Sequence, residues 1–592
     1  MSAAIQTMWA ELIAATLADA GVTTCVVSPG SRSTPLVTAL AADGRLQLPT
    51  IIDERAAAFF ALGIARATGE PVAIVCTSGS AAAHYLPALV EASMAGIPLI
   101  AITADRPPEL QQCGASQTID QIDLYGSFVR GAFDLGPPTG SAIALRAVRR
   151  KVIQAITFAR GPRPGPVHLE VPLRKPLEPA QPSTDDERAL ARTVGELRRA
   201  PLTVAPPRLV ADDAGLAALV AAIVAEPRGV IVAGAMPAQF ARARDAVFAL
   251  AARAGYPLLA ESGSQLRFGP RPTGVTAIDH FDLVLASPTI APAPRLVIQI
   301  GAEPVAASWS AAFPGATRWV LAGQDWHDAD SSAHAVLLGD VAAAVEVLAA
   351  EVELPEPRPG FAAAWQVAET RVAGAVHRAL ASHPRSEGAV LRAVFDALPP
   401  GTSIQVGNSL PIRVIDQVCS SPAGRVVLTQ RGAAGIDGLL ASAAGATRAG
   451  APVLLVLGDV SFAHDLGGLL ATREATWPLA ILVLDNGGGR IFDGLPIART
   501  NPGPAFERHF TTDPELDPTA VAQALGARAI TAATPAAAAS AVATALGDRG
   551  VTVIHAPVTP TGAHDVRRDV LELVMTSPLR PASLVTAGVT HG

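Results

Sequence analysis

Two apolar runs in the last third of the chain each lead into a polar residue, and this pair constrains the fold most. Val453–Leu457 precedes Asp459, and Leu479–Leu484 precedes Asn486. Short continuous apolar runs are typical of parallel strands buried on both faces. Because adjacent parallel strands end at one edge of a sheet, we expect the two polar side chains to share a crevice. Their oxygens suit a Mg2+ ion holding a diphosphate; the alternative is two ordinary turn residues.

The chain is long enough, at 592 residues, for three domains. Apolar strands alternate with helical patterns in three blocks, which predicts an α/β protein of three doubly wound domains with parallel sheets. We expect domains over residues 1–180, 205–352 and 380–575, with a proline- and charge-rich linker over about 172–207. The expected strands are 24–27, 72–76, 99–103 and 167–171; then 230–232, 296–300 and 319–321; then 403–406, 426–428, 453–457, 480–484 and 551–554.

Composition excludes several classes of function. Hydrophobic residues make up 50% of the chain and charged residues 16%, so large cores can form. The net charge of −7 is too mild to indicate a nucleic-acid partner. The four cysteines lack CxxC spacing, and the N-terminus has no signal-peptide pattern. Since charges interrupt every long apolar window, we expect a cytoplasmic protein that does not insert into a membrane.

The pair of Asp459 and Asn486 resembles the metal–diphosphate motif of thiamine diphosphate enzymes, with Val460 in place of a usual glycine. Such enzymes also need a glutamate that faces the aminopyrimidine ring and favours the tautomer that removes the thiazolium proton. Glu54 fits this role, between an apolar lead-in and an alanine-rich helix expected over Ala56–Ala67. The alternative is a glutamate that only stabilises the start of a helix.

Longer segments of the first and third blocks carry a more specific resemblance. They are Ser28–Leu36, Asp53–Arg55, Cys76–Ala81, Thr103–Leu110, Gly114–Gln117, Gly407–Arg413, Arg431–Gly438 and Asn486–Phe492. Together they resemble the MenD family, the 2-succinyl-5-enolpyruvyl-6-hydroxy-3-cyclohexene-1-carboxylate (SEPHCHC) synthases of menaquinone biosynthesis. The first and fourth segments are the most specific to that family, whereas the glutamate and metal motifs belong to the wider superfamily.

This resemblance implies a transferase with the three-domain fold of thiamine diphosphate-dependent decarboxylases. A pyrimidine-binding domain (1–180), a central domain (205–352) and a diphosphate-binding domain (380–575) would follow one another. The implied reaction decarboxylates 2-oxoglutarate and adds the succinyl carbanion equivalent to isochorismate by conjugate addition. It requires thiamine diphosphate and Mg2+, for which Mn2+ can substitute. The resemblance also implies a homodimer with active sites shared between subunits, or a tetramer.

The resemblance assigns roles residue by residue, with Glu54 as the catalytic residue. The implied cofactor contacts are Glu54, Ser78, Gly79, Ser80, Ile436, Asp459, Ser461, Asn486, Ile491, Phe492 and Leu495. The implied metal ligands are Asp459, Asn486 and the carbonyl of Gly488. The implied substrate contacts are Ser31, Arg32, Arg106, Gln117, Ser409, Arg413 and Arg431. Both substrates are dicarboxylates, and arginine provides a planar, permanently charged fork for a carboxylate.

The central block departs from the family pattern. Relatives carry a basic residue there, often lysine, that reaches the substrate, but Gly301–Trp309 contains no cation. The candidate replacements are Arg267, Arg271 and Arg295. We therefore expect the acceptor, isochorismate, to bind less tightly than in relatives that have this cation.

Three alternatives remain at the level of sequence. Another thiamine diphosphate carboligase, such as an acetohydroxyacid synthase relative, would act on monocarboxylates and would not need so many arginines. A nucleotide-binding oxidoreductase would need a G-x-G-x-x-G turn, but the glycines between Gly432 and Gly438 are spaced G-x-x-G-x-x-G. A non-catalytic relative would not need to keep Glu54, Asp459 and Asn486.

Overall fold

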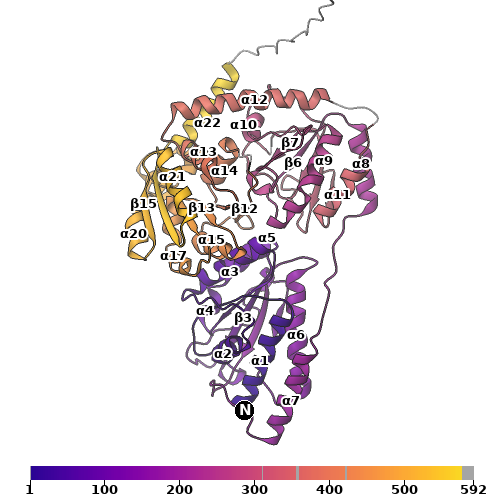
Figure 1. Cartoon of the computed structure of the whole chain (residues 1–592), viewed down its shortest axis with the longest axis vertical. Coiled ribbons are helices and arrows are strands. Elements are labelled where there is room, and N and C mark those ends of the chain that lie inside the picture. Colours follow the sequence, from indigo (N-terminus) through magenta and orange to yellow (C-terminus); the bar gives the residue numbers. More distant parts are fainter. Residues whose placement is uncertain (1, 310, 355–358, 421–422, 577–592) are drawn as a thin grey trace, which may run out of the picture.

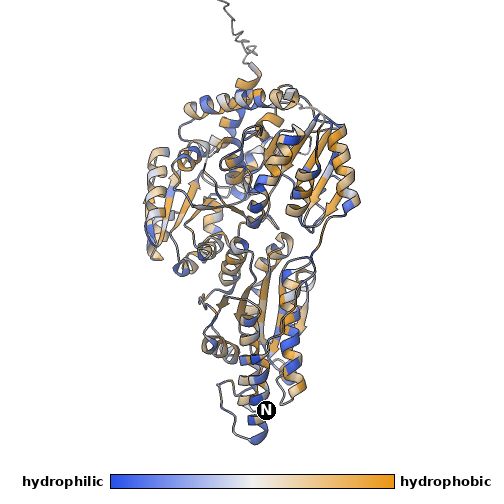
Figure 2. Cartoon of the chain, turned by 45° about the vertical axis from the view of Figure 1, so that its right-hand side comes forward, coloured by the Kyte–Doolittle hydropathy of each residue, from blue (hydrophilic) through white to orange (hydrophobic). Residues whose placement is uncertain are grey.

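In the computed structural model the chain folds around three parallel β-sheets, each covered by helices (Figure 1). The structure describes residues 2–309, 311–354, 359–420 and 423–576. In Figure 2 the strands are mostly hydrophobic along their length, because helices cover both faces of each sheet. The predicted α/β class with three doubly wound parallel sheets is therefore confirmed. Within the described ranges, no helix has the length and apolar character needed to cross a membrane.

The first sheet has the strand order β1-β2-β3-β5-β4. Its strands are β1 (Cys25–Val27), β2 (Val72–Cys76), β3 (Leu99–Asp105), β4 (Ala132–Asp134) and β5 (Val167–Pro172). The helices around it include α1 (Ala3–Asp19), α2 (Thr34–Asp43), α3 (Glu54–Thr68), α4 (Ser80–Ala83), α5 (Leu86–Ala95) and α6 (Ala142–Arg160). The short edge strand β4 was not predicted.

The expected linker after this sheet contains a helix, α7 (Asp185–Arg199). A capping box starts it: Thr184 accepts from the N–H of Glu187, and the Glu187 carboxylate accepts from the N–H of Thr184. Val194, on the inner face of α7, is buried in the core that α1 and α6 share with the first sheet. The prediction of a linker over this whole range was wrong, because a charged helix with one apolar stripe can still pack on a domain.

The middle sheet has the order β10-β9-β8-β6-β7. Its strands are β6 (Gly229–Ala233), β7 (Leu258–Ala260), β8 (Leu296–Ile300), β9 (Thr317–Ala322) and β10 (Ala335–Leu338). The helices that cover it include α8 (Asp213–Ala225), α9 (Arg244–Ala254) and α11 (Val341–Glu351). The long helix α12 (Pro359–Ser382) then passes from this sheet to the last one (Figure 1).

The last sheet has the order β12-β11-β13-β14-β16-β15. Its strands are β11 (Ser403–Val406), β12 (Val427–Thr429), β13 (Val453–Gly458), β14 (Leu479–Asp485), β15 (Arg528–Thr531) and β16 (Val551–Pro557). The helices that bear on the site are α13 (Glu387–Ala397), α14 (Leu410–Val418), α15 (Leu439–Ala446), α16 (Asp459–His464) and α22 (Gly562–Thr576). Each predicted strand of this sheet is present within three residues of its expected bounds.

Helices α3 and α15 join the first and last sheets through contact between their backbones. A Cβ built on Gly63 would lie 1.9 Å from the carbonyl oxygen of Ser442, and one on Gly445 would lie 2.0 Å from that of Phe60. Glycine is therefore required at both positions. One buried core, which includes Phe60 and Leu455, runs from the first sheet to the last across this helix pair.

Candidate active site

Asp459 and Asn486 lie at the same edge of the last sheet, as predicted. Strands β13 and β14 pair in parallel with Gly458 opposite Leu484, so the two polar residues follow adjacent strand ends. Asp459 begins helix α16 and is only 5% exposed. Its Oδ1 accepts from the N–H of Val460 at 2.8 Å, and its Oδ2 accepts from the N–H of Gly488 at 2.7 Å. Burial raises the pKa of Asp459, and these two N–H groups oppose the rise.

The oxygen atoms at this edge fit a hard cation. Asn486 is 7% exposed, and its Oδ1 is buried with no hydrogen-bond partner in the part of the chain that the structure describes. Gly488 has φ +114°, and a Cβ there would lie 2.4 Å from the carbonyl oxygen of Thr511. Only glycine can therefore hold this turn next to Asp459. A carboxylate, a free amide oxygen and a constrained backbone turn together match the ligand chemistry of Mg2+.

Glu54 is the first residue of helix α3 and is partly buried. Asp53, not Glu54, caps this helix, since its Oδ1 accepts from the N–H of Ala56 at 3.2 Å. The Glu54 carboxylate is therefore not used by the cap, although it lies in the first turn of the helix, where a negative charge is favourable. The neighbouring Ile52 is 78% exposed, which leaves an apolar side chain uncovered beside the predicted catalytic residue.

Five predicted residues gather at the end of the first sheet. Arg106 Nη1 donates to Ser78 Oγ at 2.9 Å, and Gln117 Nε2 donates to the Ser78 carbonyl at 3.0 Å. Gly79 has φ +91° and donates its N–H to Gln121 Oε1 at 2.8 Å. Ser80 follows as the first residue of α4. The implied cofactor contacts Ser78 and Gly79 therefore lie in one polar network with two implied substrate contacts.

Arg32 lies near this network but is 4% exposed. Its Nη1 donates to the Leu173 carbonyl at 2.7 Å, and its N–H donates to Thr77 Oγ1 at 3.2 Å. Burial and the charge of Arg106 lower the pKa of Arg32. The adjacent Ser31 is exposed. In this single chain Arg32 thus fixes the loop after β1, and Ser31 is the more open of the two predicted contacts.

A second arginine cluster lies in the last sheet. Arg413 Nη1 donates to the Ser409 carbonyl at 2.8 Å, and Arg431 Nη1 donates to Asn408 Oδ1 at 3.0 Å. Ser409 precedes helix α14 with φ 70°, and its hydroxyl makes no capping hydrogen bond. Burial and the charge of Arg431 lower the pKa of Arg413. The structure therefore brings Ser409, Arg413 and Arg431 together.

The remaining predicted cofactor contacts lie on the elements around Asp459, Asn486 and Gly488, which together are called the metal edge. Ile491 and Phe492 belong to the 3-10 helix η7 (Arg490–Gly494) and are partly buried, whereas Leu495 is 45% exposed. Ile436 is partly buried in the loop before α15. Ser461 is buried in α16, two residues after Asp459. Of these apolar side chains, Leu495 is therefore the one left uncovered in the single chain.

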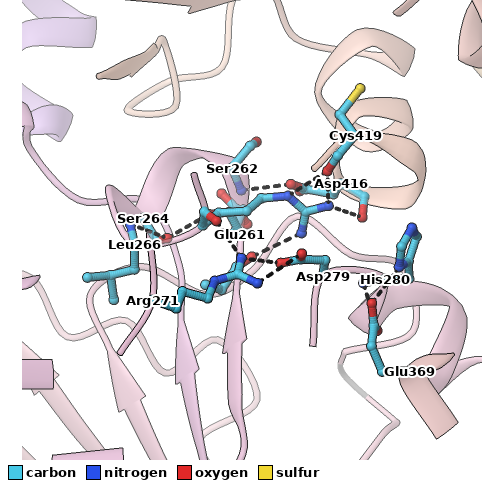
Figure 3. A network of polar contacts seen from close by, with 12 residues as sticks. Glu261, Ser262, Ser264, Leu266, Arg271, Asp279, His280, Glu369, Asp416 and Cys419 are labelled. Atoms are coloured by element: carbon cyan, nitrogen blue, oxygen red, sulfur yellow. Dashed lines mark hydrogen bonds and ion pairs between the residues drawn. The ribbon is translucent and has the colours of Figure 1, made fainter. Parts of the chain in front are cut away.

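The candidate replacements for the missing central cation are largely engaged elsewhere. Arg267 is fully buried and donates to the carbonyls of Ala260, Ile415, Asp416 and Cys419, which ties the middle sheet to helix α14. Arg271 pairs with Asp279 at 2.5 Å, as Figure 3 shows beside Glu261 and Asp416. Arg295 is exposed. Neither Arg267 nor Arg271 is therefore free to bind a substrate carboxylate.

Sequence reasoning missed three polar residues of these clusters, namely Gln121, Asn408 and Glu387. Gln121 holds the N–H of Gly79, and Asn408 holds Arg431 while donating to the Gly435 carbonyl at 2.8 Å. Glu387 Oε1 accepts from Asn486 Nδ2 at 2.9 Å. Asn408 lies within a segment that resembles the family, so that segment was a signal for it. No local pattern indicated the other two.

Comparison with known proteins identifies the class of enzyme. A family model described as "Thiamine pyrophosphate enzyme, N-terminal TPP binding domain" matches residues 8–124, and its C-terminal counterpart matches residues 413–556. The crystal structure of benzoylformate decarboxylase from Polynucleobacter necessarius has the same fold, with a TM-score of 0.69 at 18% identity over 93% of this chain and 98% of that one. The fold and the matched domains define a thiamine diphosphate-dependent enzyme.

Curated relatives narrow the class to one family. The SEPHCHC synthase of Sorangium cellulosum (strain So ce56) is 43% identical over 96% of this chain and 97% of its own length. That of Halobacterium salinarum (strain ATCC 29341 / DSM 671 / R1) is 39% identical over 96% of this chain and 98% of its own length. The chain belongs to the SEPHCHC synthase family.

Proposed function

We propose that this enzyme decarboxylates 2-oxoglutarate and joins the resulting succinyl carbanion equivalent to isochorismate, which yields SEPHCHC for menaquinone biosynthesis. The observation that carries the proposal is the pairing of a hard-cation edge at Asp459 and Asn486 with arginine clusters suited to dicarboxylates. Family membership supports the same assignment. An enzyme for monocarboxylates would have less use for Arg106, Arg413 and Arg431.

The residues would divide the work as follows. When bound, thiamine diphosphate supplies a nucleophilic carbon for the 2-oxo group of the donor and stabilises the charge left as CO2 departs. Asp459, Asn486 and the Gly488 carbonyl would hold Mg2+, and Ser461 would contact the diphosphate. Glu54 would hold the proton at a ring nitrogen of the aminopyrimidine. Ile436, Ile491, Phe492 and Leu495 would keep water away from the reacting carbon.

Substrate recognition would depend on the two arginine clusters. Arg413 and Arg431 each donate to an oxygen of the last domain. Their guanidinium groups are therefore held in place before a substrate binds. Arg106, Gln117, Ser31 and Arg32 would contact the substrates from the first sheet. The carboxylate lost as CO2 should sit away from these cations, because pairing would stabilise it in place.

A complete site requires the pyrimidine-binding domain (residues 1–180) and the diphosphate-binding domain (380–575), with the central domain (205–352) between them in sequence. We propose that these two halves come from different subunits of a homodimer, which can pair further into a tetramer. Apolar side chains beside the site residues are open in the single chain: Ile52 is 78% exposed, Ile122 54% and Leu495 45%. A second copy would cover them.

The four cysteines are free thiols, which fits a reducing compartment such as the cytoplasm.

The direct test is a reconstituted reaction. The enzyme is mixed with Mg2+, thiamine diphosphate, 2-oxoglutarate and isochorismate, and the loss of isochorismate absorbance is followed. We expect consumption of isochorismate that depends on each of the other components. Consumption that continues without 2-oxoglutarate, or its absence in the complete mixture, would refute the proposal.

A further inference from the structure

Glu387, on helix α13, has a buried carboxylate that contacts Asn486, a proposed metal ligand that follows strand β14. It is the first residue of helix α13 and is 1% exposed. Its Oε1 accepts a hydrogen bond from Asn486 Nδ2 at 2.9 Å, although the two residues are 99 positions apart in sequence. Neither the motif nor the resemblance assigns Glu387 a role.

This hydrogen bond decides which atom of the Asn486 amide faces the metal edge. A carboxylate can only accept, so it selects the NH2 end of the amide. The opposite atom, Oδ1, is the one left buried and without a partner among the described residues. Only the oxygen of an amide can ligate Mg2+, and a flipped amide would present two N–H donors to the cation instead. The orientation of Asn486 therefore decides whether the edge can bind the metal.

The surroundings of Glu387 hold its carboxylate in place. Ser386 caps α13 by accepting from the N–H of Ala389 at 3.2 Å, so Glu387 lies in the first turn, where a negative charge is favourable. Gly562, which begins α22, packs so closely that a Cβ built on it would lie 2.9 Å from Glu387 Oε2. Two helix N-termini therefore surround a carboxylate that has little room to rotate.

We infer that Glu387 is a positioning residue for the metal: it fixes the Asn486 side chain with its oxygen toward Mg2+. The inference rests on the proposed function, in which Asn486 is a metal ligand. Outer partners that orient a metal ligand commonly contribute about 10- to 100-fold to metal affinity. An effect of this size on Mg2+ affinity is expected if the hydrogen bond performs this role.

The test measures Mg2+ affinity by calorimetric titration of the protein with saturating thiamine diphosphate. Glu387→Ala should weaken Mg2+ binding about 10- to 100-fold. Glu387→Gln should retain most of the affinity, because its amide oxygen can still accept from Asn486. Equal affinity in Glu387→Ala and wild type would overturn the inference. Equal loss in both variants would also overturn it, since charge rather than orientation would then be the cause.

A reciprocal exchange tests the inference even if Glu387→Ala fails to fold. Asn486→Asp alone places two carboxylates together and should bind Mg2+ weakly. The double variant Asn486→Asp with Glu387→Gln restores a donor–acceptor pair in the opposite direction and should recover affinity. Additive losses in the double variant would contradict the proposed orientation.

A matched control separates positioning from general stability. Glu369, on helix α12, is also a buried glutamate, and it accepts from the N–H of His280 at 3.2 Å rather than from a proposed metal ligand (Figure 3). Glu369→Gln should change thermal stability without changing Mg2+ affinity, and a matching loss of Mg2+ affinity there would count against a specific role for Glu387. If wild-type protein binds no Mg2+ with thiamine diphosphate, the proposed function itself fails, and this outcome is distinct from unaffected variants of a metal-binding enzyme.

Discussion

Glu91 accepts a hydrogen bond from the backbone N–H of Gly432 at 3.0 Å and so joins helix α5 to the loop that follows Arg431. Its other oxygen accepts from the N–H of Ala433 at 2.6 Å, and Arg66 donates to the same carboxylate at 2.7 Å. Glu91 is 2% exposed. A buried residue of the first sheet therefore holds a loop that carries proposed substrate and cofactor contacts of the last sheet.

Replacing Glu91 should harm both stability and substrate binding. Glu91→Gln leaves Arg66 buried without a carboxylate, and breaking a buried pair costs about 3–5 kcal/mol. The loop should then loosen, so the KM for the substrates should rise. Denaturant unfolding and steady-state kinetics check the two effects. Asp185→Asn, in an exposed ion pair with Arg188, is the control and should alter neither quantity. Unchanged stability in Glu91→Gln would show that the contact is not needed.

The role of Glu54 predicts a large loss of rate with little loss of cofactor binding. Glu54→Gln keeps the shape of the side chain but removes its charge, so activity should fall by at least about 100-fold, the scale of one general acid–base contribution. Thiamine diphosphate affinity should fall much less. Turnover assays and calorimetry measure the two quantities, with the exposed Glu70→Gln, two residues after the end of α3, as the control. Near-normal turnover in Glu54→Gln would mean that the assignment is wrong.

The shared site predicts complementation between two inactive variants. Asp459→Ala should lose Mg2+-dependent cofactor binding, because the diphosphate loses its bridging charge. In a heterodimer of Glu54→Gln and Asp459→Ala subunits, one site carries both changes and the other carries neither. Co-expression with random pairing should therefore restore about one quarter of wild-type activity.

The alternative is a site built within one chain. An ion pair between the first and last domains of the same chain makes this alternative worth testing. Arg55 on α3 pairs with Asp465, just after α16, at 3.3 Å in the same chain. If the site lay within a single chain, every site of the mixed dimer would carry one damaging change. The co-expressed variants would then stay inactive, contrary to the shared site.

A buried acid between the middle and last sheets predicts a pH effect on stability. Glu261 is 0% exposed and accepts from the N–H of Val305 at 2.7 Å. Burial and the nearby charge of Asp416 raise the pKa of Glu261 (Figure 3). Above the ordinary glutamate pKa the folded state therefore binds more protons than the unfolded state, and stability falls as pH rises through the raised pKa.

Glu261→Gln should remove this effect, because its amide oxygen can still accept from Val305 and carries no charge. The free energy of unfolding of the variant, relative to wild type, should increase between about pH 5 and about pH 9, by about 1.4 kcal/mol for each unit of pKa shift. Denaturant unfolding at several pH values measures it. The exposed Glu572→Gln is the control. A difference that stays constant with pH would refute the raised pKa.

The central strands of the sheets were predictable from the sequence. Central strands such as β13 and β14 are continuous apolar runs, and the polar residues after them mark the metal edge. Short edge strands such as β10 and β15 were missed: β15 contains no continuous apolar run, and β10 is an apolar run of only four residues. Helix α7 was also missed, although Thr184 and Glu187 fit a capping box and gave a local signal.

Contacts between distant residues were not predictable in the same way. Glu91 and Gly432 are separated by 341 positions, and nothing near either residue indicates the other. The same holds for Arg267, whose choice between a substrate and the carbonyls of α14 depends on how two sheets pack. Site residues with a family motif could be named, whereas the residues that hold them in place required the structure.

The central claim is that the arginine clusters select a dicarboxylate donor, and donor choice tests it most directly. The measurement compares kcat/KM for 2-oxoglutarate and pyruvate with isochorismate as the acceptor. Losing one charge-assisted contact costs about 1.5–3 kcal/mol, or about 10- to 150-fold, so two lost contacts should make pyruvate a very poor donor. We predict a strong preference for 2-oxoglutarate that falls in Arg413→Ala, while thiamine diphosphate affinity changes little. Comparable kcat/KM for the two donors would contradict the claim and favour an acetohydroxyacid synthase-type carboligase.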